Sequence, residues 1–483
     1  MPFPFTLPTT SAFSFSSTYT SPSHPSLPLT ASTYRGVVRD ALKKHKRLPP
    51  ASRAPNVPSL VSSLTAYLPY LLAIDAGLRD DAAIADLRVS PKSTAPPSIE
   101  WRPTLSDPGV RTALEAPRAK LDDLDHEIAF VLLTLASCHS LLARAALHPL
   151  YDTSAAFSTP EERTTAIQVA TRSLLAAAPI YEYAASRADN TASRPPCADV
   201  APPTARGLAA LAVAEATLLA VLKDDPYPAA VAQDRNKQDK EWMYKAPEIA
   251  KVRAHLFARL CLAAADHAAR AAALLRSAAP GKIDAELVRY VEDLRRTSRA
   301  KACRFFGIDA ELGGQMGTAI AWLNAGLGEL GIEARDDGGG RKGFAGLSRL
   351  KREWSEKRED RRVEKETAWG ADGGRAEEGR VIQMLSEKWN KVNDTVGTQV
   401  IPPVGPLLAK MPAGREIHGN IPPFSPPVLD RDALDAIRAP PDRSDDFGDL
   451  QSSDDEDRAS EKTVVGAFPG DYSRSGSTST GYY

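Results

Sequence analysis

Alanine-rich stretches in which an apolar residue recurs every three or four positions run through most of this chain from about residue 30 onward. Short segments rich in Pro, Asp and Ser separate these stretches, whereas the alternating β-branched residues typical of strands are scarce. The pattern predicts a mainly α-helical protein whose long helices pack as antiparallel hairpins, in the manner of an α-solenoid. Minor β elements fit only within the first 30 residues and at Ser98–Arg102.

The apolar spacing places several long helices. The best-marked one begins at Thr159-Pro160-Glu161-Glu162, because a capping hydroxyl, a proline in the first turn and two carboxylates all favour the positive end of a helix. That helix should end near Ala185. The others are expected near residues 32–47, 58–80, 121–148, 203–224, 246–277, 283–306 and 312–330, with a short one at Arg431–Arg438.

The last two long helices resemble a tetratricopeptide-type pair. They should be joined near Gly307–Glu311, and small residues lie where the helices of such a pair approach closely. Phe305, Trp322 and Leu327 follow the helical spacing expected of its core. The period of about 34 residues that defines these repeats does not recur cleanly, so an irregular array is expected.

The helical domain is expected to span residues 1–430, with a flexible glycine-rich loop at 337–345 inside it. The charged segment after this loop, Lys351–Glu366, contains Trp354 and fits either a solvated helix face or a partner surface. Residues 440–483 are acidic and rich in serine, and they contain too little apolar area to offset chain entropy. We therefore expect a disordered tail.

Composition excludes several functional classes. The net charge of −1 lacks the basic excess that nucleic-acid binding requires. No Cys-x-x-Cys pair occurs, so neither a zinc site nor a disulfide framework is indicated, and a reducing intracellular compartment is expected. The four widely separated cysteines are Cys138, Cys197, Cys261 and Cys303.

The two most apolar runs, Ile128–Ala136 and Gly207–Leu222, are shorter than the roughly 20 residues that a membrane span requires. The second also carries Glu215, a charged residue in an otherwise apolar stretch. Both runs are therefore expected to be buried helices. The first residues have neither the basic segment nor the continuous apolar core of a signal peptide, so a cytosolic chain is expected.

No catalytic constellation emerges from the sequence. The glycine-rich cluster Gly338–Gly343 lacks the spacing of a phosphate loop, and the chain has neither a Gly-x-Ser-x-Gly elbow nor a His-x-x-x-His pair. An enzyme is therefore disfavoured, and no cofactor or metal is expected.

Several short segments, taken in their order, resemble the BRO domain, the boomerang-shaped helical module of Alix-type proteins. Ile99-Glu100-Trp101-Arg102 precedes the first long core helix, Asp122–Leu147. Glu248-Ile249-Ala250-Lys251-Val252 is similar to the Ile-Ala-Lys-Leu signature of the family, and Glu387–Gly419 is similar to its closing segment. The opening ten residues and the stretch Lys43–Pro49 resemble the PalC family, the fungal pH-response regulators among BRO-domain proteins.

This resemblance implies a non-catalytic adaptor that binds an amphipathic helix of the ESCRT-III polymer subunit. The family's aromatic anchor falls at about Leu218 or Leu219. Its aliphatic anchors fall at Ile249 and Val252, with Lys251 between them as a partner for acidic residues of the bound helix. Helical spacing alone would assign the four aliphatic residues to the core.

The resemblance also implies a role in alkaline-pH signalling, in which the adaptor is required for proteolytic activation of a zinc-finger transcription factor. The expected location is the cytoplasm, with recruitment through partners to cortical plasma-membrane or endosomal sites. Two alternatives remain, an Alix-like endosomal cargo-sorting adaptor and a generic tetratricopeptide-like scaffold.

Overall fold

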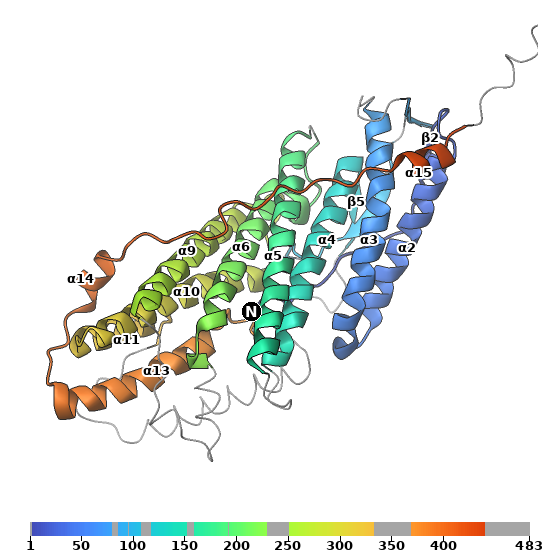
Figure 1. Ribbon diagram of the computed structural model, residues 1–483. Coiled ribbons are helices and arrows are strands. Elements are labelled where there is room, and N and C mark those ends of the chain that lie inside the picture. The colour runs from blue at the N-terminus through green and yellow to red at the C-terminus, as the bar shows by residue number, and fades with distance from the viewer. Residues whose placement is uncertain are drawn as a thin grey trace, which may run out of the picture. The chain divides into compact units, whose positions relative to one another are not determined.

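The computed structural model describes residues 2–79, 86–94, 96–107, 117–151, 159–191, 193–228, 251–332 and 369–439. The side chains of Lys251 and Val252 are outside this description, as are the predicted loop at 337–345, the charged segment around Trp354 and the predicted tail at 440–483. Residues 1–439 form one compact unit, and its described part is mainly helical, as predicted (Figure 1).

The long helices form a sequential array in which each packs against the next one along the chain (Figure 1). A further helix, α13 (Arg375–Val392), packs against the last two of them. The long helices are α2 (Leu27–Arg47), α3 (Pro50–Leu78), α4 (Leu124–Leu147), α5 (Pro160–Asp189), α6 (Pro202–Asp224), α9 (Lys251–Arg276), α10 (Ala285–Leu312) and α11 (Met316–Glu329).

Two small antiparallel sheets lie in the N-terminal part. Three of their strands fall within the segments predicted to hold minor β structure, whereas β3 (Ser90–Pro91) and β5 (Ala119–Leu121) lie outside them. The larger sheet has the strand order β1-β4-β5, and Trp101 of β4 lies opposite both Thr10 and Ala119. The buried indole of Trp101 stacks on Phe130 of α4, with 5.0 Å between ring centroids. The strands are β1 (Thr9–Thr10), β2 (Tyr19–Thr20), β3 (Ser90–Pro91), β4 (Ile99–Arg102) and β5 (Ala119–Leu121), and a short helix α1 (Phe15–Thr18) precedes β2.

Two predicted boundaries were wrong by more than five residues, and α2 begins at Leu27 rather than near residue 32. Helix α3 begins at Pro50 rather than near residue 58, and it continues through Pro55 and Pro58, which the sequence had placed in or at the edge of a loop. Helix α10 continues to Leu312, so its turn does not lie near Gly307–Glu311. Glycine at position 307 permits α10 to pack closely against α11, because a Cβ there would lie 3.1 Å from the carbonyl oxygen of Ala319.

The array has two large clusters of buried apolar side chains, one in its N-terminal half and one around α10 and α11. Phe305, Trp322 and Leu327 lie in the second cluster, which confirms their predicted core positions. By length and composition alone, α3, α4 and α6 could each cross a membrane, so their apolar stretches are longer than the sequence analysis indicated. Within the array, 78% of the α4 window and 72% of the α6 window are buried.

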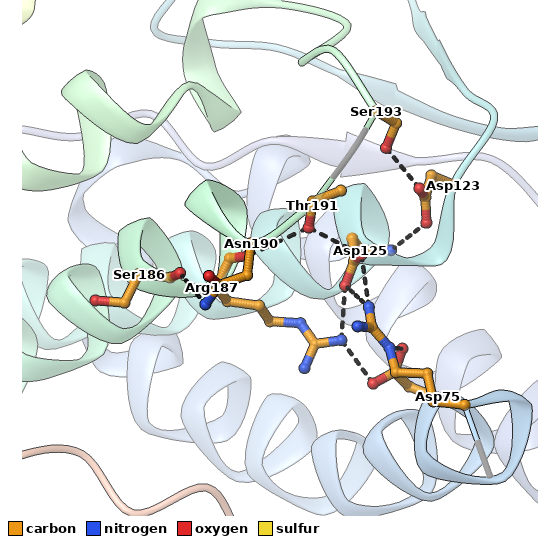
Figure 2. A network of polar contacts seen from close by, with 9 residues as sticks. Asp75, Asp123, Asp125, Ser186, Arg187, Asn190, Thr191 and Ser193 are labelled. Carbon is orange, nitrogen blue, oxygen red and sulfur yellow. Dashed lines mark hydrogen bonds and ion pairs between the residues drawn. The ribbon is translucent and has the colours of Figure 1, made fainter. Parts of the chain in front are cut away.

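Charged side chains join the last turn of α3, the first turn of α4 and the last turn of α5 (Figure 2). The Arg187 guanidinium lies 2.6 Å from carboxylate oxygens of both Asp75 and Asp125, and Arg79 Nη2 lies 2.6 Å from the other oxygen of Asp125. Burial alone would raise the pKa of Asp125, but Arg187, a hydrogen bond from Thr191, and Arg79 lower it. Three successive helices are thus fixed to one another by paired charges.

A second charged group lies deep in the first apolar cluster. Glu127 of α4 is fully buried and accepts hydrogen bonds from Arg35 Nε at 2.9 Å and Tyr67 Oη at 3.2 Å. The indole Nε1 of Trp101 donates to its other oxygen. A single carboxylate therefore holds α2, α3 and the larger sheet against α4.

Residues 398–439 form a strap that follows α13 and a π-helical turn (Asn393–Gly397) and crosses the helices back toward the N-terminal end (Figure 1). The Arg415 N–H donates to the Arg259 carbonyl of α9 at 2.9 Å, and the Ala439 N–H donates to the Ser23 carbonyl at 2.8 Å. At Gly414 a Cβ would lie 2.5 Å from the Ala263 nitrogen, so only glycine permits this approach. The strap includes the short helices α14 (Val404–Ala409) and α15 (Arg431–Ala436).

Candidate protein-binding site

The predicted anchor residues lie on α6 and at the beginning of α9. Leu218 and Leu219 are in the last two turns of α6, Lys251 and Val252 begin α9, and Ile249 lies outside the described residues. The two helices are antiparallel neighbours, because a Cβ on Gly207 would lie 3.0 Å from the Leu275 side chain.

This register fixes the spacing of the two predicted anchor regions. Pairing Gly207 with Leu275 and its neighbours places Leu218 level with residues 260–264 of α9. The first residues of α9 are therefore roughly 15 Å farther along the helix axis at 1.5 Å per residue. An occupant that contacts both Leu218 and the beginning of α9 must therefore be about three helical turns long.

The two adjacent leucines of α6 have different environments. Leu219 is only 4% exposed and packs in a small apolar cluster with Leu147 of α4 and Trp369. Leu218 is half-buried, contacts both large apolar clusters and lines a cavity. Leu218 is thus the accessible member of the pair, and Leu219 belongs to the core.

The cavity beside Leu218 is partly apolar and partly charged. Helix α6 supplies one wall, and α10, the start of α13 and the first residues of the chain supply the others. It is lined by Pro2, Tyr151, Glu215, Leu218, Leu219, Val221, Leu222, Asp225, Leu294, Lys301, Gly373, Gly374 and Glu377. Leu218 thus borders a cavity whose walls carry both apolar and charged side chains.

Glu215, one turn before Leu218, connects the cavity to the N-terminal segment. Its Oε1 accepts a hydrogen bond from the Tyr290 hydroxyl at 2.6 Å and another from the Phe3 N–H at 3.1 Å. Burial raises the pKa of Glu215 to about 7, against the lowering effects of Tyr290, Phe3 and Arg144. This carboxyl therefore changes charge near neutral pH.

Arg144 of α4 fixes two other segments at the same place. Its guanidinium donates to the Pro2 carbonyl at 2.8 Å and to the Trp369 carbonyl at 2.6 Å. It also lies over the Trp369 ring, 4.1 Å from the centroid. The N-terminal wall of the cavity and the segment that precedes α13 are thus attached to α4 by one side chain.

Arg304 of α10 is fully buried between two carboxylates, one of which, Asp225, lines the cavity. Its Nη2 lies 2.6 Å from Asp225 Oδ2, and its Nε lies 2.6 Å from Glu378 Oε1. Lys301 also reaches Glu378, at 2.7 Å. The pKa of Asp225 is lowered because Arg304 outweighs the effect of burial, whereas burial raises the pKa of Glu377. These pairs join the end of α6 to α10 and α13.

From the sequence, Glu215 stood out only as a charged residue within an apolar run. Its partners lie far away in the sequence, Phe3 at a separation of 212 positions and Tyr290 at a separation of 75. The one available signal was the isolated charge itself, since a carboxylate in a buried helix needs donors from elsewhere. Among the residues that the structure describes, no group of three His, Cys, Asp or Glu side chains is placed to hold a metal ion.

Glu215→Gln is expected to change how stability depends on pH. The folded wild type keeps a proton on Glu215 up to about pH 7, whereas the unfolded chain loses it near pH 4.5, so Glu215 lowers stability as pH rises through this window. Glutamine keeps the acceptor oxygen but does not ionise. Relative to wild type, the variant should gain up to about 3 kcal/mol of unfolding free energy between pH 5 and pH 8. Urea unfolding of the wild type and the variant at pH 5 and pH 8 measures this gain. A difference in unfolding free energy that is the same at both pH values would contradict the prediction.

Comparison with known proteins identifies the family of the chain. No family model matches the chain. A curated relative, the pH-response regulator protein palC of Emericella nidulans, is 41% identical over 512 aligned residues, covering 97% of this chain and 99% of the relative. The chain belongs to the PalC family. A second PalC protein, from Cryptococcus neoformans var. neoformans, is 27% identical over 498 residues, covering 88% of this chain and 93% of its own.

The fold is also found in a solved structure of ALIX in complex with the SIVmac239 PYKEVTEDL late domain. The TM-score is 0.53 at 14% sequence identity, and the match covers 89% of this chain. The chain spans about half the length of that ALIX chain, 49%. The BRO-type helical fold predicted from the sequence is thereby confirmed, as is the predicted membership of the PalC family of pH-response regulators.

Proposed function

We propose that this PalC-family protein is a non-catalytic BRO-domain adaptor of fungal ambient-pH signalling that binds the ESCRT-III polymer subunit. The observation that carries the proposal is 41% identity along nearly the whole length of a pH-response regulator. The helical array, with its half-buried leucine beside a cavity, supports an interaction role. In this proposal the adaptor works in the cytoplasm, is recruited to cortical plasma-membrane or endosomal sites, and is required for proteolytic activation of a zinc-finger transcription factor at alkaline pH.

The proposed occupant is the amphipathic C-terminal helix of the ESCRT-III subunit. A helix of about ten residues covers the roughly 15 Å between Leu218 and the beginning of α9. One apolar anchor would enter the cavity at Leu218, and others, about two to three or more turns farther along the bound helix, would contact Val252 and Ile249. Lys251 would pair with acidic residues of the bound helix. Few anchors carry most of the energy in this mode of recognition.

Ile249→Asp and Leu218→Asp are each expected to weaken binding of a peptide with the ESCRT-III C-terminal helix at least about 30-fold, because each places a charge at an apolar anchor. Fluorescence anisotropy with a labelled peptide and the full chain measures this. The matched control is Leu29→Asp, since Leu29 is 61% exposed on α2 and the same chemical change there should leave binding unaltered.

Folding must be checked separately, because Leu218 also contacts the core. Circular dichroism and thermal unfolding should match wild type for Ile249→Asp, and Lys251→Glu serves as a second variant that tests the same surface by charge. Wild-type affinity in well-folded Ile249→Asp and Lys251→Glu variants would rule out the assigned surface.

A cell experiment separates this proposal from an Alix-like cargo-sorting role. Deleting the gene should abolish growth only at alkaline pH and leave endosomal cargo sorting intact. A sorting defect at every pH would favour the cargo adaptor instead.

A further inference from the structure

Positive charge gathers where α2 ends, α3 begins and the larger sheet has its edge. Three structural elements contribute to this basic surface, which lies away from α6 and α9. It consists of Lys43, Lys44, Lys46, Arg47, Arg53, Arg102, Arg118 and Lys120. The acidic Glu100 lies opposite Lys120 within this group, and the whole chain has a net charge of −1, so the grouping of cations is a local feature.

The sheet brings two arginines together. Glu100 lies opposite Lys120 and Trp101 opposite Ala119, so the same register continued by one residue places Arg118 beside Arg102. Like charges directly opposite each other on a sheet repel. One terminal nitrogen of Arg118, Nη1, is also buried without a hydrogen-bond partner among the described residues.

Helix α2 adds Lys46 to this pair. The pKa of Lys46 is lowered by partial burial and by the charges of Arg102 and Arg118, which shows that the three cations lie close enough to repel one another. His45 stays neutral near pH 7, because burial and Arg53 lower its pKa to about 4.

Helix stabilisation does not account for the whole surface. Lys44, Lys46 and Arg47 in the last turn of α2 interact favourably with the negative end of that helix. Arg102 and Arg118 belong to the sheet and gain nothing from the helix end. The charges of Arg102 and Arg118 nevertheless act on Lys46 at the end of α2.

We propose that this basic surface binds the anionic headgroups of a lipid bilayer. Its charges are spread over a helix end, a hairpin turn and a sheet edge, which suits a plane of many phosphates without a fixed register. The hairpin turn between the helices also exposes the apolar residues Pro49, Pro50 and Ala51 beside the cations. The contact is independent of the ESCRT-III surface, so either can fail alone.

The test uses the full chain and sedimentation with phosphatidylcholine vesicles that contain or lack phosphatidylserine. Wild type should bind only the anionic vesicles, and its binding should fall as salt is raised. The triple variant Lys44→Glu, Lys46→Glu, Arg47→Glu should bind at least about a hundredfold more weakly, since each cation near an anionic surface contributes about fivefold. The control reverses three dispersed, exposed cations, Arg270, Arg289 and Lys391, to Glu and should bind as wild type does.

Two results would overturn the proposal. Equal vesicle binding by the triple variant and the control would show that general charge, not this surface, attracts lipid. A preference of wild type for a duplex DNA oligonucleotide over anionic vesicles, lost in the triple variant, would reassign the surface to nucleic acid. Unchanged ESCRT-III peptide binding and circular dichroism of the triple variant would show that its fold is intact.

Discussion

Glu127→Ala should lower the free energy of unfolding by about 3–5 kcal/mol, among the largest effects of any single substitution in this domain. The change leaves the fully buried guanidinium of Arg35 without its counter-charge. It also removes the acceptor of the Tyr67 hydroxyl and of the Trp101 indole, and a buried donor without a partner costs about 1–3 kcal/mol. Urea unfolding followed by circular dichroism measures the loss.

Two further variants show whether the unpaired charge is the cause. The double variant Arg35→Met, Glu127→Met removes both charges and should recover much of the loss, because apolar residues can replace a buried ion pair. Glu161→Ala, at an exposed position in the first turn of α5, should change stability by no more than about 0.5 kcal/mol. A loss below about 1 kcal/mol for Glu127→Ala would contradict the assigned role.

Arg304→Ala is the second substitution with a large expected effect, again about 3–5 kcal/mol, because it removes the cation that pairs with both buried carboxylates, Asp225 and Glu378, and leaves Lys301 to pair with Glu378. The pKa of Asp225, which Arg304 lowers in the wild type, should then rise, so the loss should shrink at acidic pH, where this carboxyl holds a proton. Thermal unfolding across a pH series measures both effects.

The control for this prediction is Arg270→Ala, because Arg270 is exposed on α9 and should be nearly neutral. Asp225→Asn combined with Glu378→Gln in the Arg304→Met background should restore stability relative to Arg304→Ala. A deficit of Arg304→Ala that stays constant across the pH series would show that lost packing, rather than unpaired charge, is responsible.

Helix positions were predictable where the determining signal is local. Thr159 and Glu162 form a reciprocal capping box, with hydrogen bonds of 2.9 and 3.2 Å, and α5 begins as predicted. At α3 the local signal misled, since Pro55 and Pro58 normally end a helix. Burial of the leucines on the core face of α3 outweighs the proline cost, and this contribution depends on contacts with other helices.

The candidate site was predictable only to the level of the helix that carries it. Leu218 and Leu219 are adjacent and both border the cavity, yet one residue turns a side chain by about 100° around the axis, so Leu218 is half-buried and Leu219 packs in the core. Glu127 shows the same limit for charge. Its partners lie 92, 60 and 26 residues away, and no local sequence pattern predicts them.

The strap at 398–439 changes how such an array can open. Helices that touch only their neighbours can fray from either end, one hairpin at a time. By bonding to α9 and to the turn before α2, the strap joins segments far apart in sequence, which raises the contact order and favours opening as one cooperative unit. The helices are also synthesised before it, so a nascent chain displays the uncovered face of the array until the strap emerges from the ribosome.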